Sequence, residues 1–452
     1  MLRRSFLALS LFTVVTAYAA ETGLDRYVKK PDSTYAYSVV NKVAGEGYTF
    51  YAVDLTSQTW RKPSEVDRTV WKHWLTIVKP DKVEHNTGYL FITGGKTTDA
   101  APARANPAYV EMATLTHSVI AELQDIPNEP LTFTSDGKPR SEDGIIAYTW
   151  IKFFETGDET WPLRLPMTKA AVRAMDTIQT VAGAGALTKF VVSGGSKRGW
   201  TTWTTAAVDP RVSAIMPASI DLLNLQASFE HHWKVYGFWA PAVKDYVQEG
   251  VMDWTGTPQY KALLEEVEPY SYRDRLTMPK FLVQAAGDQF FLPDSSRFYF
   301  DDLKGEKYLR YVPNTDHSLR NSDARESMVA FYDAFLRGVP RPQFSWTFEK
   351  NGDIRVATKQ KPTAVKLWQA TNPEHRDFRL ETLGAKYAGS DLQDDGKGVY
   401  VAHVAAPEKG WTAYFVELTF PSGGKYPFKF TTAVRVNPDT EPFPAYVPKR
   451  KQ

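Results

Sequence analysis

The chain has 452 residues, of which 43% are apolar and 13% aromatic, and it contains no cysteine. This length and composition favour two domains with buried cores and exclude a disordered protein, a disulfide scaffold, a thiol nucleophile and a cysteine-ligated metal. Basic and acidic residues nearly balance, with 54 Lys and Arg against 52 Asp and Glu, which argues against nucleic acid and membrane surfaces as partners.

Residues 1–20 have the three parts of a secretory signal peptide. Two arginines precede an apolar run over residues 6–15, and a small-x-small cleavage site follows at residues 17–19. The run is too short to span a membrane, and no later run approaches that length. Residues 3–7, R-R-S-F-L, also resemble a twin-arginine export motif, so the export route stays open. We expect a soluble mature protein in the periplasm or outside the cell.

Residues 21–340 alternate between short β-branched or aromatic runs and longer helix-like segments, most clearly from about residue 86 to 337. This pattern predicts an α/β domain with a mostly parallel sheet that helices bury on both faces. The expected strands are 89–93, 118–123, 190–193, 214–218, 281–286 and 308–312, and the expected helices are 168–181, 197–208 and 323–336.

Residues 222–272 interrupt this rhythm with an aromatic-rich, helix-like stretch. The stretch lies between two expected strands, where open α/β folds often insert material over the carboxyl edge of the sheet. We interpret it as a cap over the site. Extra helices that only pack against the core are the alternative.

Residues 341–452 have a different pattern. Asn351-Gly352 separates two alternating segments, which is a strong hairpin signal. Further strands are expected at 365–370, 398–404, 412–420 and 427–436. These residues predict a small antiparallel β-sandwich domain of the immunoglobulin-like type.

The stretch from Phe190 to Trp203 reads F-V-V-S-G-G-S-K-R-G-W-T-T-W. It predicts a sharp strand-to-helix turn that lifts Ser196 above the sheet, because such a turn needs small neighbours. The spacing is G-x-S-x-x-G, whereas the usual nucleophile turn is G-x-S-x-G. A phosphate-binding turn and a plain strand-helix corner are the alternatives.

Two downstream residues complete a catalytic triad in the chain order of α/β-hydrolases. Asp288 follows one expected strand and His317 follows the next, so both lie where open α/β sheets place their chemistry. Ser196 is the expected nucleophile, His317 the base and Asp288 the acid that orients it. Three other aspartates compete for the role of the acid: Asp221, Asp294 and Asp316.

An oxyanion hole is expected from the N–H of Lys197 together with the loop at Gly94 and Gly95, because glycines let a backbone approach a tetrahedral intermediate closely. Lys197 and Arg198 are cations in the first helical turn, where they oppose the helix dipole. Either one contacts an anionic substrate group, or they form ion pairs with residues 142 and 143. We favour the ion pair for Arg198.

No metal or other cofactor is expected. His231 and His232 are adjacent, and neighbouring residues of a helix point about 100° apart, so they do not form one chelating face.

Four stretches resemble the PhoPQ-activated pathogenicity-related protein family: R-S-E-D-G-I-I-A-Y-T-W at 140–150, T-W-P-L-R-L-P-M-T-K-A at 160–170, S-G-G-S-K-R-G-W at 193–200 and D-Q-F-F-L-P-D-S-S-R-F-Y from 288. The resemblance covers essentially the whole mature chain. It implies a secreted or periplasmic α/β-hydrolase, linked to virulence and to resistance against antimicrobial peptides, with Ser196 as the nucleophile. It implies no substrate. The G-x-S-x-x-G spacing is also similar to that of glucuronoyl esterases, which keeps carbohydrate esters among the options.

The sequence therefore predicts an exported serine hydrolase that acts on a small ester or a short peptide. The alternative is a non-catalytic binding or signalling protein on a hydrolase scaffold, since the chain is also similar to a secreted proliferation-repressing signal protein.

Overall fold

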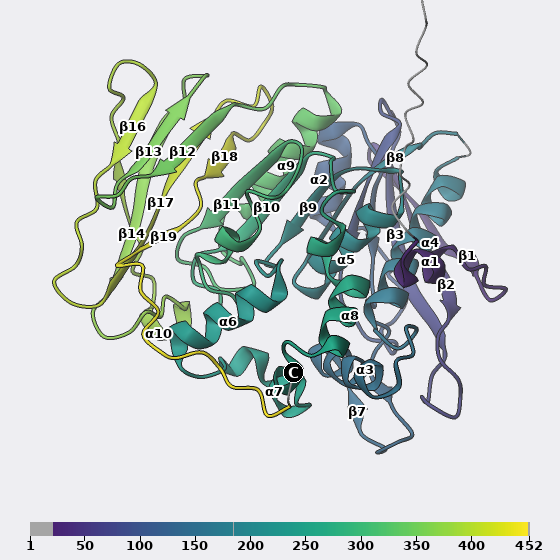
Figure 1. The fold of residues 1–452 in the computed structure, drawn as a ribbon. Helices are drawn as coiled ribbons and strands as arrows, with labels where there is room; N and C mark the ends of the chain where they lie inside the picture. Colours follow the sequence, from purple (N-terminus) through teal and green to yellow (C-terminus); the bar gives the residue numbers. More distant parts are fainter. Residues whose placement is uncertain (1–20, 184, 451–452) are drawn as a thin grey trace, which may run out of the picture.

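The computed structural model describes residues 21–183 and 185–450 (Figure 1). The predicted signal peptide, residues 1–20, lies outside this part. Within it, one sheet of 14 strands runs through the molecule. The strands follow the order β1 (Ala36–Gly45), β2 (Tyr48–Thr59), β3 (Val70–Pro80), β5 (Ile120–Leu123), β4 (Thr87–Ile92), β8 (Lys189–Gly195), β9 (Val212–Ala218), β10 (Lys280–Ala285), β11 (Lys307–Val312), β18 (Phe428–Thr431), β17 (Trp411–Phe420), β14 (Ala364–Asn372) and β15 (Ala388–Asp391), with β19 (Arg435–Asn437) also on β17.

The centre of the sheet confirms the expected α/β architecture. Strands β5, β4, β8, β9, β10 and β11 are parallel, and they match the six strands that the sequence predicts. Helices bury both faces of this part of the sheet. On one face, Val192 of β8 belongs to the core under α4 (Arg164–Ala182) and α5 (Lys197–Val208). On the other face, Val191 belongs to the core under α2 (Pro107–Thr116) and α9 (Ala324–Leu336). Strand β10 is accordingly buried at every position.

The first three strands of the sheet are antiparallel, and the sequence analysis did not predict them. Every residue of β1 is exposed or half-buried, so no apolar period marks it. Strands β2 and β3 pair antiparallel with each other, and β3 also pairs antiparallel with β5. Strand β5 lies beside β4, where the parallel part of the sheet begins. This is the α/β-hydrolase type of fold.

The segment between β9 and β10 is helical, as expected. It holds α6 (Leu225–Tyr236), α7 (Lys244–Gln248) and α8 (Pro258–Val267), joined by short 3-10 turns. The C-terminal tail runs beside these helices (Figure 1). The N–H of Phe443 donates to the carbonyl of Lys234 in α6, and the hydroxyl of Tyr446 donates to Asp253. No helix among the described residues combines the length and the apolar character that crossing a membrane requires.

The C-terminal strands are antiparallel, as predicted, but one of the expected strands is divided into two. β12 (Phe344–Phe348) and β13 (Ile354–Thr358) form the expected hairpin around Gly352, whose φ is +101°. With β16 (Val399–Ala402) they make a second small sheet, which packs on the large one. The expected single strand at 427–436 is wrong, because β18 and β19 pair with different parts of β17.

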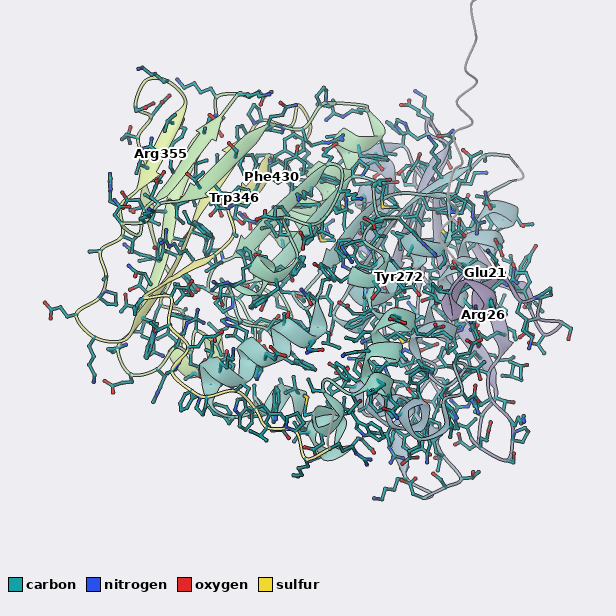
Figure 2. The ribbon with its side chains drawn as sticks, in the orientation of Figure 1. Glu21, Arg26, Tyr272, Trp346, Arg355 and Phe430 are labelled. Atoms are coloured by element: carbon teal, nitrogen blue, oxygen red, sulfur yellow. The ribbon has the colours of Figure 1, made fainter. Side chains whose placement is uncertain are left out.

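The large sheet does not end where the parallel strands end. Leu309 of β11 pairs with Thr431 of β18, so the C-terminal strands continue the sheet beyond residue 340, the boundary expected between two domains. Figure 2 shows the two ends of the molecule, with Glu21 and Arg26 at one end and Arg355 at the other.

Candidate active site

Ser196 lies in a strained turn between β8 and α5. Its backbone has φ +57° and ψ −128°, a conformation that costs free energy for a residue with a side chain. Its N–H donates to the carbonyl of Ala218 on the neighbouring strand at 2.8 Å. Ser196 is the N-cap of α5, yet its side chain caps no helical N–H group. The hydroxyl is therefore not used for holding the helix.

The glycine spacing around Ser196 follows from packing. A Cβ at Gly194 would lie 2.7 Å from the carbonyl oxygen of Arg198, and a Cβ at Gly199 would lie 3.0 Å from that of Ala218. A Cβ at Gly195 would meet nothing within 4 Å. The two outer glycines of G-x-S-x-x-G are thus required by close backbone contact, and the glycine directly before the serine is not.

Asp288 and His317 are hydrogen-bonded, as the sequence predicts. The distance between Asp288 Oδ2 and His317 Nδ1 is 2.8 Å. Asp288 is only 4% exposed, and its other oxygen accepts the N–H of Phe290 at 2.7 Å. The rings of Phe290 and Phe291 lie beside the imidazole, with centroids 4.4 and 5.7 Å away. His317 Nε2 is buried and has no hydrogen-bond partner among the described residues.

The competing aspartates are engaged elsewhere. Asp294 is paired with Arg376 at 2.8 Å and His231 at 3.2 Å, and although burial opposes its ionisation, Arg376 and His231 hold its pKa well below the usual range. Asp221 accepts hydrogen bonds from two tyrosine hydroxyls, and burial raises its pKa to about 7. Asp316 accepts from the N–H and hydroxyl of Ser318.

The backbone of Ala218 and Ser219 connects the serine to the histidine. Ser196 donates its N–H to Ala218, and the hydroxyl of Ser219 donates to the carbonyl of His317 at 2.7 Å. Ser219 itself donates its N–H to Val283 of β10. Ser196 follows the carboxyl end of β8, Asp288 follows that of β10, and His317 follows that of β11. Because these strands belong to the parallel part of the sheet, their carboxyl ends lie at the same edge. His317 Nε2 and Ser196 Oγ are not hydrogen-bonded to each other.

The loop with Gly94 and Gly95 lies against the first turn of α5. A Cβ at Gly94 would be 2.5 Å from the guanidinium of Arg198. In the part of the chain that the structure describes, the N–H groups of both glycines have no acceptor. The first N–H groups of a helix also lack intrahelical partners, which applies to Lys197. The loop and the helix start therefore offer unused donors near Ser196.

Both cations after the serine form ion pairs, Arg198 with Glu142 and Lys197 with Glu142 and Asp143. Its guanidinium binds both oxygens of Glu142, at 2.7 and 2.9 Å, and its Nε donates to the carbonyl of Ile126. Lys197 Nζ lies 2.5 Å from Glu142 and 3.2 Å from Asp143. Burial raises the pKa of Glu142, but the two cations outweigh it and hold the pKa below its ordinary value.

Two residues of this network, Glu129 and Arg164, have no role in the sequence analysis. The N–H of Glu142 donates to Glu129, and Arg164 donates to the carbonyl of Lys197 at 2.9 Å while its guanidinium lies over the Trp200 ring. Arg164 falls inside the stretch 160–170, which carried the family resemblance and was the available signal. Nothing in the sequence marks Glu129.

Asp125 is a second unpredicted residue at the site. It is buried, and its Oδ1 has no partner among the described residues. A Cβ at Gly95 would lie 2.2 Å from that oxygen. Burial, together with nearby Asp99, raises the pKa of Asp125 to about 6. A carboxyl that is easily protonated therefore lies directly behind the candidate oxyanion loop.

The described residues contain no cluster of three or more histidine, aspartate or glutamate side chains arranged to hold a metal ion. His231 contacts Asp294 and Glu441, whereas His232 accepts the N–H of Ala240, so the adjacent histidines point to different partners.

Comparison with known proteins gives the chain a family. The profile of the PhoPQ-activated pathogenicity-related proteins matches residues 24–379. Autocrine proliferation repressor protein A of Dictyostelium discoideum is 37% identical over 470 aligned positions, which cover 97% of this chain and 95% of that protein.

Similar solved structures are more distant. An acetyl xylan esterase from Paenibacillus sp. R4 is 14% identical with a TM-score of 0.49, over 70% of this chain and 95% of that one. An acylaminoacyl peptidase from Pyrococcus horikoshii is 13% identical with a TM-score of 0.40, over 67% of this chain and 49% of that one. Given the match over most of its length and a relative similar along nearly all of it, the chain belongs to the PhoPQ-activated pathogenicity-related protein family.

Proposed function

We propose that the protein is a serine hydrolase with Ser196 as nucleophile, His317 as base and Asp288 as the orienting acid. The observation that supports this most is the Asp288–His317 hydrogen bond, which directs a buried and unpaired Nε2 away from the acid. An imidazole held by a carboxylate at Nδ1 is ready to accept a proton at Nε2. The strained backbone of Ser196 supports the same assignment.

In the reaction, Ser196 Oγ forms a bond to the substrate carbonyl carbon while its proton moves to His317 Nε2. The N–H groups of Lys197 and of the Gly94–Gly95 loop stabilise the oxyanion. His317 then gives the proton to the leaving group, and a water molecule, activated by the same imidazole, releases the acyl group. No cofactor takes part.

The substrate is an ester or a peptide bond, because the same residues serve both. Helices α6 to α8 act as a cap at the carboxyl edge of the sheet, which favours small esters and short peptides over folded proteins. The mature protein acts in the periplasm or outside the cell, after removal of residues 1–20. The family description supports a link to pathogenicity, for instance through cleavage of antimicrobial peptides.

A second candidate function is non-catalytic signalling. It is favoured by the 37% identity to a protein named for repressing proliferation, which extends over 97% of this chain and 95% of that protein. In that case the triad would be a remnant and the protein would act by binding a receptor.

A fluorophosphonate probe separates the two functions, since it labels only an activated serine. Wild type, Ser196→Ala, His317→Ala and the exposed control Ser390→Ala are compared as purified, folded mature proteins. The hydrolase requires labelling of the wild type and the control, and loss of labelling in the other two. A folded wild type that stays unlabelled would favour the signalling function.

A further inference from the structure

Two cavities lie along strand β12, away from Ser196. One has a volume of about 670 Å³ and the other about 740 Å³, and both are lined by Lys307, Phe344 and Ser345. They therefore adjoin at these residues, and together they are here called the β12 groove. Its walls come from β12, from residues 294–308, from residues 340–343 and 357–359, and from residues 433–439. Neither Ser196, Asp288 nor His317 lines it.

Aromatic side chains form a row in this groove. Phe344, Trp346 and Phe348 alternate along β12, so they lie on one face of the strand. The Trp346 ring stacks on Phe300, with centroids 5.7 Å apart and an interplanar angle of 29°. Phe348 is 43% exposed. Figure 2 shows Trp346 on the inner side of the small sheet, toward Phe430, whereas Arg355 lies on the outer side.

Two charged side chains of the groove form no ion pair within the described residues, although the charge of Asp301 acts on nearby Lys307, whose Nζ donates to the carbonyl of Asp301. Among residues 21–183 and 185–450, no cation lies within ion-pair distance of Asp301 and no carboxylate within ion-pair distance of Arg435. One terminal nitrogen of Arg435 donates to the carbonyls of Glu349 and Asp353, and the guanidinium lies over the Phe348 ring, 5.4 Å from its centroid. Lys307, by contrast, is satisfied by three backbone carbonyls. The carboxylate of Asp301 and the other terminal nitrogen of Arg435 thus line the same depression as the aromatic row.

We propose that the β12 groove binds a neutral oligosaccharide. The apolar face of a sugar ring packs on an aromatic ring such as that of Trp346. Sugar hydroxyls both donate and accept hydrogen bonds, whereas a carboxylate only accepts and a guanidinium only donates, so Asp301 and Arg435 together suit a polyhydroxylated ligand. Two joined cavities suit a chain of rings better than one small molecule.

An extended peptide is the competing ligand, because β12 is an edge strand of the small sheet and a peptide would add to it through backbone hydrogen bonds. The N–H of Gln343, at the start of that edge, already donates to Gln360. Peptide addition also leaves the unpaired charges of Asp301 and Arg435 unexplained. These observations favour the oligosaccharide.

Affinity electrophoresis in native gels that contain soluble polysaccharide tests the proposal without using catalysis. The probes are hydroxyethyl cellulose, xylan and galactomannan, each against wild type, Trp346→Ala and Asp301→Asn. Trp368→Ala, a change of a half-buried tryptophan outside the groove, is the matched control. Reduced and carboxymethylated α-lactalbumin in the gel serves as the unfolded-polypeptide probe.

We expect at least one polysaccharide to retard the wild type and Trp368→Ala equally, and the apparent affinity to fall about tenfold or more in Trp346→Ala. Asp301 is exposed, so Asp301→Asn tests the groove even if Trp346→Ala does not fold. Absence of retardation by all three polysaccharides would overturn the proposal. So would retardation that neither groove variant reduces, or retardation by the unfolded polypeptide alone. The outcome is independent of fluorophosphonate labelling, so it stands whether or not Ser196 is a nucleophile.

Discussion

Asp288 binds His317 through one oxygen and the backbone of its own loop through the other. The first contact is 2.8 Å long, and the second, to the N–H of Phe290, is 2.7 Å. The loop therefore fixes the carboxylate, and the carboxylate fixes which imidazole nitrogen carries the proton. An amide in its place can donate to Nδ1, which favours the wrong tautomer.

Asp288→Asn is accordingly expected to lower kcat by about 10⁴ with little change in the melting temperature. The matched change is Asp316→Asn, which removes the neighbouring carboxylate that accepts hydrogen bonds from the N–H and the hydroxyl of Ser318. Hydrolysis of an activated ester, once one is found to be a substrate, measures both. Equal losses in the two variants would show that Asp288 is not the orienting acid.

Gly194→Ala and Gly195→Ala are expected to differ although the residues are adjacent. The new methyl group at 194 would press on the backbone of Arg198 at 2.7 Å, whereas the one at 195 enters open space. Overpacking of this kind costs about 1–3 kcal/mol, so Gly194→Ala should lower the free energy of unfolding by that amount and Gly195→Ala by less than about 1 kcal/mol. Urea denaturation measures both values, and comparable losses would contradict the packing explanation of the glycine spacing.

Arg198 and Glu142 are expected to be energetically coupled. Their bidentate contact joins the first turn of α5 to the start of α3 (Glu142–Thr156). A double-mutant cycle with Arg198→Ala and Glu142→Ala should give a coupling free energy of about 1–2 kcal/mol, because half of the pair is partly exposed. The exposed pair of Lys409 and Glu374 is the control, for which we expect less than about 0.5 kcal/mol. A negligible coupling for the first pair would show that the contact does not hold the two helices together.

The raised pKa of buried Glu268 leads us to expect that the free energy of unfolding depends on pH. Its carboxylate accepts the N–H groups of Asn224 and Leu225 at the start of α6, and burial raises its pKa to about 8 from the ordinary 4.5. The folded state therefore holds the proton more tightly than the unfolded state. The corresponding stability is complete below about pH 4.5 and is lost as the pH rises to about 8.

Glu268→Gln removes this titration while it keeps an acceptor oxygen. The variant should gain stability relative to wild type by a few kcal/mol between pH 5 and pH 9, as measured by urea denaturation at both values. Glu265→Gln, an exposed neighbour, should show no such change. A constant difference between Glu268→Gln and wild type across this range would mean that Glu268 is ionised in the folded protein.

The parts of the fold that the sequence predicts are those with strong local patterns. The parallel strands are continuous apolar runs, and the hairpin is marked by Asn351-Gly352. Strand β1 has no buried face to leave a pattern, and the break between β18 and β19 depends on their separate partners on β17, which a single sequence does not reveal.

The same distinction applies to the site. Ser196, Asp288 and His317 follow strand ends, so their positions are readable from chain order. Residue 142 is an expected ion-pair partner of Arg198 although the two lie 56 residues apart, whereas the contact of Arg198 with Ile126, 72 residues away, is seen only in the folded structure. Asp125 gave no signal because its burial behind Gly95 is a tertiary effect.

The pairing of β11 with β18 has a consequence for how the chain melts. Since the backbone hydrogen bonds of one sheet cross from the parallel strands into the C-terminal strands, neither part can lose its structure without exposing a strand edge of the other. We expect a single cooperative heat-absorption peak in calorimetry of the mature protein. We also expect residues 341–452, produced alone, to aggregate through the uncovered edge of β18, so the two halves of the chain behave as one folding unit.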